Sequence, residues 1–257
     1  MTSTNLLDLK LSGQTAWVLG ASGAIGSAIA VMLAELGVRV WLSGRNETKL
    51  QEVCDRITRA GGQASIHVLD ATQSAAVDSA ATVIVRAAGR IDILVNSTAL
   101  PTFGKFTELT DADWERTFQS KLMVYVRTMR AVLPHMVEMG GGTIVNISGK
   151  AGRLPSPAHL PGGSMNAAIN LLTKGIADAY QHQGIRANTI APGPIASERL
   201  NALTAQLATI ATAKPEFMAR KGEPEDVARA VAWLASPLSD YMNGIVLPLD
   251  GGSIPTV

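Results

Sequence analysis

Short apolar runs alternate along the chain with longer segments in which apolar residues recur at helical spacing. An apolar run of about four to eight residues is typical of a strand that is covered on both faces, whereas longer periodic segments favour helices. This pattern predicts strands at residues 15–20, 39–42, 64–69, 91–95, 143–147, 186–191 and 244–249. It predicts helices over approximate ranges 21–36, 46–60, 77–87, 111–139, 164–180 and 224–235.

Strands and helices follow one another without a break in composition, which predicts a single domain over residues 1–257. The predicted fold class is α/β, a doubly wound parallel sheet of about seven strands with helices on both faces. We expect Pro134 to bend or shorten the helix that contains it. Residues 152–163 carry three prolines and three glycines and are expected to form a loop.

Residues 194–222 are a candidate substrate lid. Small residues dominate this segment, but four larger apolar side chains recur in it at helical spacing: Leu200, Leu203, Leu207 and Ile210. The alternative interpretation is one more amphipathic helix of the core.

Composition narrows the classes of function. Hydrophobic residues make up 47% of the 257 residues and charged residues 17%, enough for a sizeable core. A formal net charge of +1 and the absence of a basic run argue against nucleic acid or an anionic membrane as the main partner. The single cysteine, Cys54, excludes an internal disulfide and a cysteine-based metal site. The first ten residues show no signal peptide, so we expect a cytoplasmic location.

A glycine-rich turn, Gly20-Ala21-Ser22-Gly23-Ala24-Ile25-Gly26, connects the first predicted strand to a helix. Such a turn offers backbone N–H groups and a helix N-terminus to a pyrophosphate. Glycine also marks ordinary tight turns. The prediction of nucleotide binding therefore depends on the residues at the ends of the other strands as well.

Ligands of open parallel sheets bind at the carboxyl ends of the strands, near the point where the strand order reverses. Arg45 follows the second strand, where an acidic residue would hold a ribose 2′-OH and an arginine suits a 2′-phosphate. A solvated surface arginine is the alternative. Asp70 follows the third strand and is a candidate partner for the adenine amine, with a helix cap as the alternative. Because residue 45 is an arginine and not an acid, the sequence favours NADP(H) over NAD(H).

The chain carries, in this order, the motifs Gly20-x-x-x-x-Ile25-Gly26, Gly44-Arg45-Asn46, Asp70-Ala71-Thr72, Ile93-Leu94-Val95-Asn96, Arg130-Ala131-Val132-Leu133-Pro134-His135-Met136, Gly142-Thr143-Ile144-Val145-Asn146-Ile147-Ser148, Gly184-Ile185-Arg186-Ala187-Asn188, Pro192-Gly193-Pro194-Ile195, Gly222-x-Pro224-Glu225-Asp226-Val227-Ala228 and Asp250-Gly251-Gly252. In these motifs it resembles the short-chain dehydrogenase/reductase family over nearly its whole length. The resemblance implies a Rossmann-like fold, NADP(H), a small-molecule substrate and a homotetramer or homodimer built on the two long helices. The cofactor-binding residues that it implies are Gly20, Ser22, Gly23, Ile25, Gly26, Arg45, Asp70, Ala71, Asn96, Pro192, Gly193, Ile195 and Ser197.

The catalytic positions depart from the family pattern. In the family, a tyrosine exchanges the hydroxyl proton, and a lysine four residues later holds the nicotinamide ribose. A serine thirteen residues before the tyrosine positions the carbonyl, and a helix asparagine completes a proton relay. These positions fall, in the same order, on Gly162, Asn166, Gly149 and Lys121. None of the three tyrosines of the chain is followed four residues later by a lysine.

Four residues are candidates to replace the missing groups. Lys121 lies at the relay position, although a lysine there can also extend out of its helix. Ser148 is one residue away from the serine position, and Asn166 can donate to a ribose hydroxyl without bringing a charge. His159 is the histidine near the expected site, with an ordinary loop histidine as the alternative.

We interpret the chain as an NADP(H)-binding oxidoreductase with an atypical active site that acts on a small apolar carbonyl or alcohol compound. One alternative is a non-redox enzyme on the same scaffold, such as a lyase or a hydrolase. Another is a non-catalytic module that senses NADPH or partners an active subunit. Binding of NADPH without its oxidation would favour these alternatives.

Replacement of Arg45 tests the cofactor preference. A charge-assisted hydrogen bond contributes about 1.5–3 kcal/mol, so Arg45→Ala should weaken NADPH binding roughly tenfold or more and leave NADH binding nearly unchanged. Fluorescence titration with both cofactors measures this. Equal affinity of the unaltered protein for NADPH and NADH would contradict the prediction.

Overall fold

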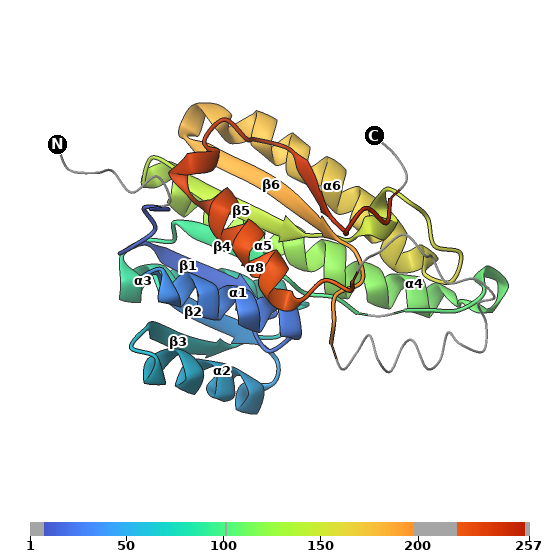
Figure 1. Cartoon of the computed structure of the whole chain (residues 1–257), viewed down its shortest axis with the longest axis horizontal. Coiled ribbons are helices and arrows are strands. Elements are labelled where there is room, and N and C mark those ends of the chain that lie inside the picture. Colours follow the sequence, from blue (N-terminus) through green and yellow to red (C-terminus); the bar gives the residue numbers. More distant parts are fainter. Residues whose placement is uncertain (1–7, 101, 198–219, 255–257) are drawn as a thin grey trace.

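The computed structural model describes residues 8–100, 102–197 and 220–254 (Figure 1). Within these ranges, seven strands form one parallel sheet in the order β3-β2-β1-β4-β5-β6-β7. The strands are β1 (Thr15–Leu19), β2 (Arg39–Gly44), β3 (Gln63–Val68), β4 (Ile93–Asn96), β5 (Gly142–Ile147), β6 (Ile185–Pro192) and β7 (Val246–Leu249). The α-helices are α1 (Ala24–Glu35), α2 (Glu47–Arg59), α3 (Ser74–Ala88), α4 (Asp111–Thr117), α5 (Met123–Glu138), α6 (Leu160–Tyr180) and α8 (Pro224–Ala235). The predicted α/β fold is confirmed.

The two faces of the sheet bury separate cores, because successive side chains of a strand point to opposite faces. In β1, Ala16 and Val18 join the core beneath α1, α2 and α8. Trp17 and Leu19 join the core beneath α3, α5 and α6. Figure 1 shows α1 and α8 side by side on one face of the sheet. Both faces of the strands are therefore covered, which explains their nearly continuous apolar sequence.

The strand order reverses between β1 and β4, which are neighbours in the sheet. Their helical connections leave in opposite directions from this point, so a crevice forms beyond the carboxyl ends of the two strands. β1 ends at Leu19 and β4 at Asn96. The glycine-rich turn and the loop after β4 therefore lie at the position where such sheets bind ligands.

The long helix predicted over 111–139 is divided at a different place from the one expected. A π-helical turn, Phe118–Leu122, separates α4 from α5, whereas Pro134 lies inside α5 without ending it. A proline removes one helical N–H donor. The carbonyl that loses this donor belongs to Arg130, an exposed residue of α5. Of the two expected effects of Pro134, bending or shortening of the helix, shortening does not occur.

Helix α6 begins at Leu160, inside the segment predicted to be a loop. Pro161 lies in its first turn, where the missing N–H has no helical partner to lose. Gly162 and Gly163 are consequently helical residues, both buried. The prolines and glycines of this segment were weaker evidence for a loop than their number suggested.

A buried chain of polar side chains connects the centre of the sheet to α5 and α6. The Thr128 hydroxyl donates to Asn96 Oδ1 over 2.8 Å, and Asn96 Nδ2 donates to Asn146 Oδ1 over 2.9 Å. Asn146 Nδ2 in turn donates to the Thr173 hydroxyl over 2.9 Å. All four side chains are buried, so each bond replaces one that water would otherwise make.

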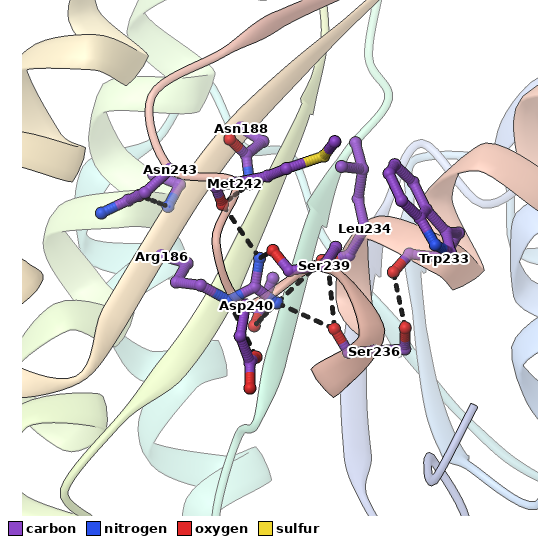
Figure 2. Close-up of polar contacts among 11 residues, drawn as sticks. Arg186, Asn188, Trp233, Leu234, Ser236, Ser239, Asp240, Met242 and Asn243 are labelled. Carbon is purple, nitrogen blue, oxygen red and sulfur yellow. Dashed lines mark hydrogen bonds and ion pairs between the residues drawn. The ribbon is translucent and has the colours of Figure 1, made fainter. Parts of the chain in front are cut away.

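Arg186 on β6 holds the connection between α8 and β7 (Figure 2). Its guanidinium donates to the backbone carbonyls of Leu234, Ser236, Ser239 and Met242. Burial lowers the pKa of Arg186, and the Asp240 carboxylate opposes this shift. An arginine remains charged even so, and its five N–H donors suit a cluster of carbonyls.

The two ends of the candidate lid are connected. Ile195 and Gly222 form a parallel bridge, in which Ala196 N donates to Gly222 O over 2.7 Å. The predicted helical positions Leu200, Leu203, Leu207 and Ile210 lie outside the described residues. Among the described helices, none is both long enough and apolar enough to cross a membrane.

Removal of the central amide of the buried chain should be costly. Asn146→Ala deletes the hydrogen bonds with Asn96, Thr173 and the Met129 sulfur and leaves Asn96 Nδ2 buried without its acceptor, so we expect the free energy of unfolding to fall by about 2–4 kcal/mol. Urea denaturation measures this change. Gln63→Ala, at an exposed position of β3, is the control and should change stability by less than about 0.5 kcal/mol. Equal losses in the two variants would contradict the prediction.

Candidate active site

The glycine-rich turn after β1 packs directly against the end of β4. Gly20 has a positive φ of 76°, and a Cβ atom at this position would lie 2.5 Å from the Ser97 carbonyl oxygen. A Cβ atom at Gly26 would lie 2.2 Å from the Gly20 carbonyl oxygen. Both contacts are with backbone, which cannot move aside cheaply. Glycine is therefore required at both positions.

The N-terminus of α1 is open toward the crevice. Its N-cap residue, Gly23, makes no side-chain cap, and the first turn of the helix carries no acidic residue. The first N–H groups of a helix have no helical acceptor, and the helix dipole adds partial positive charge there. Nothing in this turn competes with an anion for these groups. The arrangement can hold a phosphate.

Two more of the predicted residues, Arg45 and Asp70, follow the ends of β2 and β3. Arg45 is exposed and directly follows Gly44, the last residue of β2. A Cβ atom at Gly44 would lie 3.1 Å from the Ser22 hydroxyl oxygen, so β2 and the glycine-rich turn are in close contact. Asp70 Oδ1 accepts hydrogen bonds from the backbone N–H and the hydroxyl of Thr72. One oxygen of this carboxylate is thus bonded within the turn before α3. This local role is similar to the helix cap that was the alternative interpretation of Asp70.

The remaining predicted cofactor residues lie at the ends of β3, β4 and β6. Asn96 uses both halves of its carboxamide in the buried chain, so its side chain is committed to the interior of the protein. Ala71 and Ile195 are buried. Gly193 lies against the C-terminal loop, where a Cβ atom would be 2.9 Å from Asp250 Cα. The Ser197 hydroxyl donates to the Ile195 carbonyl over 3.4 Å, just before the undescribed segment 198–219.

Lys121 lies in the π-helical turn and is 5% exposed. Its Nζ donates to the Ser148 carbonyl oxygen, just beyond β5, over 3.3 Å. The alternative that this lysine extends out of its helix was therefore wrong. A π-turn widens the helix by one residue and is frequent at functional sites. Here the turn carries a cation next to the carboxyl end of β5.

Tyr125, which sequence reasoning passed over, lies one helical turn after Lys121. Its hydroxyl donates to the Ile147 carbonyl over 2.8 Å and lies 3.2 Å from the Thr98 carbonyl. Complete burial raises the pKa of this hydroxyl, so the proton stays on oxygen. The available sequence signal was the spacing of four residues between Lys121 and Tyr125, which places both side chains on the same side of a helix. Tyr125 thus holds β4 and β5 together and does not exchange a proton near neutral pH.

Ser148 and Asn166 approach the same loop from different elements. The Ser148 hydroxyl donates to the Ile190 carbonyl over 3.4 Å. A Cβ atom at Gly149 would lie 2.9 Å from Asn166 Nδ2, so the amide occupies the side of the loop where the family serine would project. Asn166 is 3% exposed, and within the described residues its Oδ1 has no hydrogen-bond partner. That oxygen is an acceptor that a ligand hydroxyl could satisfy.

His159 lies in the loop directly before α6, as the N-cap residue of that helix. Its Nδ1 lies 3.0 Å from the Thr102 carbonyl oxygen. Its ring stacks on Phe103, with centroids 4.3 Å apart and planes inclined by 19°. Sequence reasoning missed Thr102 and Phe103, because no local pattern connects the loop after β4 with the start of α6. The loop and the helix meet only through tertiary packing.

Comparisons with known proteins cover almost the whole chain. A family model described as enoyl-(acyl carrier protein) reductase matches residues 20–253. The chain is 34% identical over 244 residues to gluconate 5-dehydrogenase of Gluconobacter oxydans, covering 95% of each. It is 30% identical over 251 residues to a 3-oxoacyl-(acyl-carrier-protein) reductase of Chlamydia pneumoniae, covering 96% of this chain and 99% of that protein.

A solved structure has the same fold. The crystal structure of a gluconate 5-dehydrogenase from Burkholderia cenocepacia in complex with NADP and tartrate matches with a TM-score of 0.88 and 30% identity. The match covers 97% of this chain and 98% of that one.

The raised pKa of Tyr125 predicts a pH dependence of stability. The unfolded chain ionises this tyrosine above about pH 10 and the folded protein does not, so its contribution to stability is lost as the pH rises beyond that value. Between about pH 10 and 11, Tyr125→Phe should therefore lose about 1 kcal/mol less stability than the unaltered protein in urea denaturation. Tyr241→Phe, at an exposed tyrosine, should keep the original slope. An unchanged slope in Tyr125→Phe would contradict the prediction.

Proposed function

The chain belongs to the short-chain dehydrogenase/reductase family, and we propose that it is an NADP(H)-dependent oxidoreductase with an atypical active site. The observation that carries the proposal is the uncapped N-terminus of α1 beside the crevice between β1 and β4. We further propose that its substrate is a small carbonyl or alcohol compound with an apolar part. Phe103, whose ring stacks on His159, supports an apolar wall at this site.

The residues present fit a bound NADP(H). The open turn suits the pyrophosphate, and exposed Arg45 suits a ribose 2′-phosphate. The buried Asn166 Oδ1 without a partner in the described part of the chain suits a hydroxyl of the nicotinamide ribose. Bound NADP(H) would supply or accept a hydride at the substrate carbon. The relative whose structure carries NADP supports the same cofactor.

The chain's own residues differ from the family set at four positions, which carry Lys121, Gly149, Gly162 and Asn166. Lys121 is the buried cation among them. An ammonium at the carboxyl end of β5 would stabilise negative charge that develops on a substrate oxygen. In this proposal Lys121 provides the charge that the family lysine would bring from the position of Asn166.

A non-catalytic NADPH-binding module is the second candidate. The observation that favours it is the glycine at position 162, because a glycine has no group that exchanges a proton. The two candidates differ in one outcome. Titration with NADPH, followed by assays with a panel of carbonyl and alcohol compounds, gives binding with turnover for the enzyme and binding alone for the module.

We also propose a homodimer or homotetramer built on α5 and α6. A groove of about 590 Å³ lies between these helices, and most of its lining side chains are apolar: Val126, Met129, Leu133, Pro134, Val137, Leu172 and Ile176. Leu171 on α6 is 78% exposed. A second copy of the chain would remove this apolar surface from water.

Loss of the Lys121 charge should abolish most of the turnover. Lys121→Met keeps the length of the side chain but removes the ammonium, so we expect kcat/KM to fall by about 10² or more while NADPH affinity and Tm stay close to those of the unaltered protein. Lys174→Met, at an exposed lysine of α6, is the control and should retain full activity. Full activity in Lys121→Met would contradict this role.

A further inference from the structure

The imidazole of His159 occupies the space into which a side chain at position 162 would project. A Cβ atom at Gly162 would lie 2.0 Å from His159 Cε1 and 2.1 Å from His159 Nε2. Ordinary van der Waals contact between such atoms begins near 3.4 Å. An imidazole in this position and any side chain at residue 162 therefore exclude each other.

Contacts of both the ring and the backbone hold His159 in place. Nδ1 lies 3.0 Å from the Thr102 carbonyl, and the Phe103 ring stacks on the imidazole. The Gly163 N–H donates to the His159 carbonyl over 2.9 Å, which attaches the backbone of His159 to the first turn of α6. The loop after β4 and the start of α6 thus hold the histidine from two sides.

The contact with Thr102 also determines which ring nitrogen titrates. A carbonyl oxygen only accepts hydrogen bonds, so Nδ1 carries a proton in both the neutral and the charged imidazole. The proton that comes and goes is then the one on Nε2. Nε2 is also the nitrogen next to the Cβ direction of Gly162.

We propose that His159 is the proton donor and acceptor of this site and takes, in space, the place that the family tyrosine has in sequence. The assignment rests on the proposed oxidoreductase function. During reduction, the substrate carbon gains a hydride supplied by NADPH, the π-electron pair of the carbonyl moves to oxygen, and oxygen takes the proton from Nε2 of the imidazolium. The products are NADP⁺, the alcohol and a neutral imidazole, which regains its proton from water. Oxidation of an alcohol runs through the same atoms in reverse.

An imidazole suits this role because it exchanges protons near neutral pH. Its position follows from Gly162, since even an alanine there would displace the ring. The glycine that removes the family tyrosine also creates the room for the histidine. The glycine at position 162 and the histidine at position 159, which look unrelated in the sequence, thus belong to one structural feature.

The first part of the test uses turnover. His159→Asn keeps an N–H for the Thr102 carbonyl but has no titratable nitrogen, so kcat/KM should fall by about 10² to 10⁴. Gly162→Ala should cause a similar loss by displacing the ring, although His159 itself is unchanged. Gly175→Ala is the matched control, because it lies in the same helix with open space around its Cβ and should retain full activity.

Chemical rescue separates catalysis from a structural role. Added imidazole should restore part of the activity of His159→Ala and leave the activity of the control Gly175→Ala unchanged, because free imidazole replaces a lost proton carrier but not lost packing. NADPH affinity should be the same in every variant. Turnover that survives in His159→Asn, or His159→Ala with intact NADPH binding that imidazole does not rescue, overturns the assignment and leaves the proposed function standing.

The second part of the test needs no turnover. In ¹⁵N NMR of histidine-labelled protein, the signal that His159→Asn removes should report Nδ1–H and a bare Nε2 in the neutral state. Gly162→Ala should shift this signal, whereas Gly175→Ala should not. A neutral state with Nε2–H, or a signal that Gly162→Ala leaves in place, overturns the assignment. Absence of NADPH oxidation by the unaltered protein with every carbonyl tested overturns the proposed function and the assignment with it.

Discussion

The buried hydrogen-bonded chain from Thr128 through Asn96 and Asn146 to Thr173 is the constraint on which the site depends. A buried amide that loses its partner costs about 1–3 kcal/mol, so a shift of the strands or helices that separates these four groups is disfavoured. Asn96 and Asn146 are directly paired across β4 and β5. The chain therefore fixes α5 and α6 relative to the strand ends that carry the chemistry.

The next contacts follow from this register. Asn146 is followed by Ile147, the last residue of β5, and then by Ser148, and the carbonyls of these two residues receive hydrogen bonds from Tyr125 and Lys121. These donors lie on the helical segment that also carries Thr128, at about one-turn intervals. On the other side, α6 carries Thr173 at one end of the buried chain and Asn166 nearer its start. One polar chain thus aligns the helix with the cation and the helix with the histidine.

Small residues allow the site to be built from a divergent set of groups. Gly152 and Gly163 let the loop after β5 approach α6 within backbone contact, because a Cβ atom at either position would lie 3.0 Å or less from the opposite segment. The space beside Gly162 is filled by the side chain of His159, three residues earlier in the chain. In the proposed site, the group lost at position 162 is replaced by His159, whose ring packs into the same volume.

Local pattern by itself determined the strand and helix sequence of the described residues, the glycine-rich turn and the residues at the strand ends, since these depend on periodicity and on backbone conformations that only glycine adopts. It did not determine where the helix after β4 is interrupted, because a π-turn leaves no compositional mark while Pro134 does. It could not show that Asn96 faces inward or that Lys121 is buried, since both depend on neighbours far away in sequence. Tertiary structure alone decided that the His159 ring fills the space beside Gly162, because the volume next to a residue is known only after the chain has folded around it.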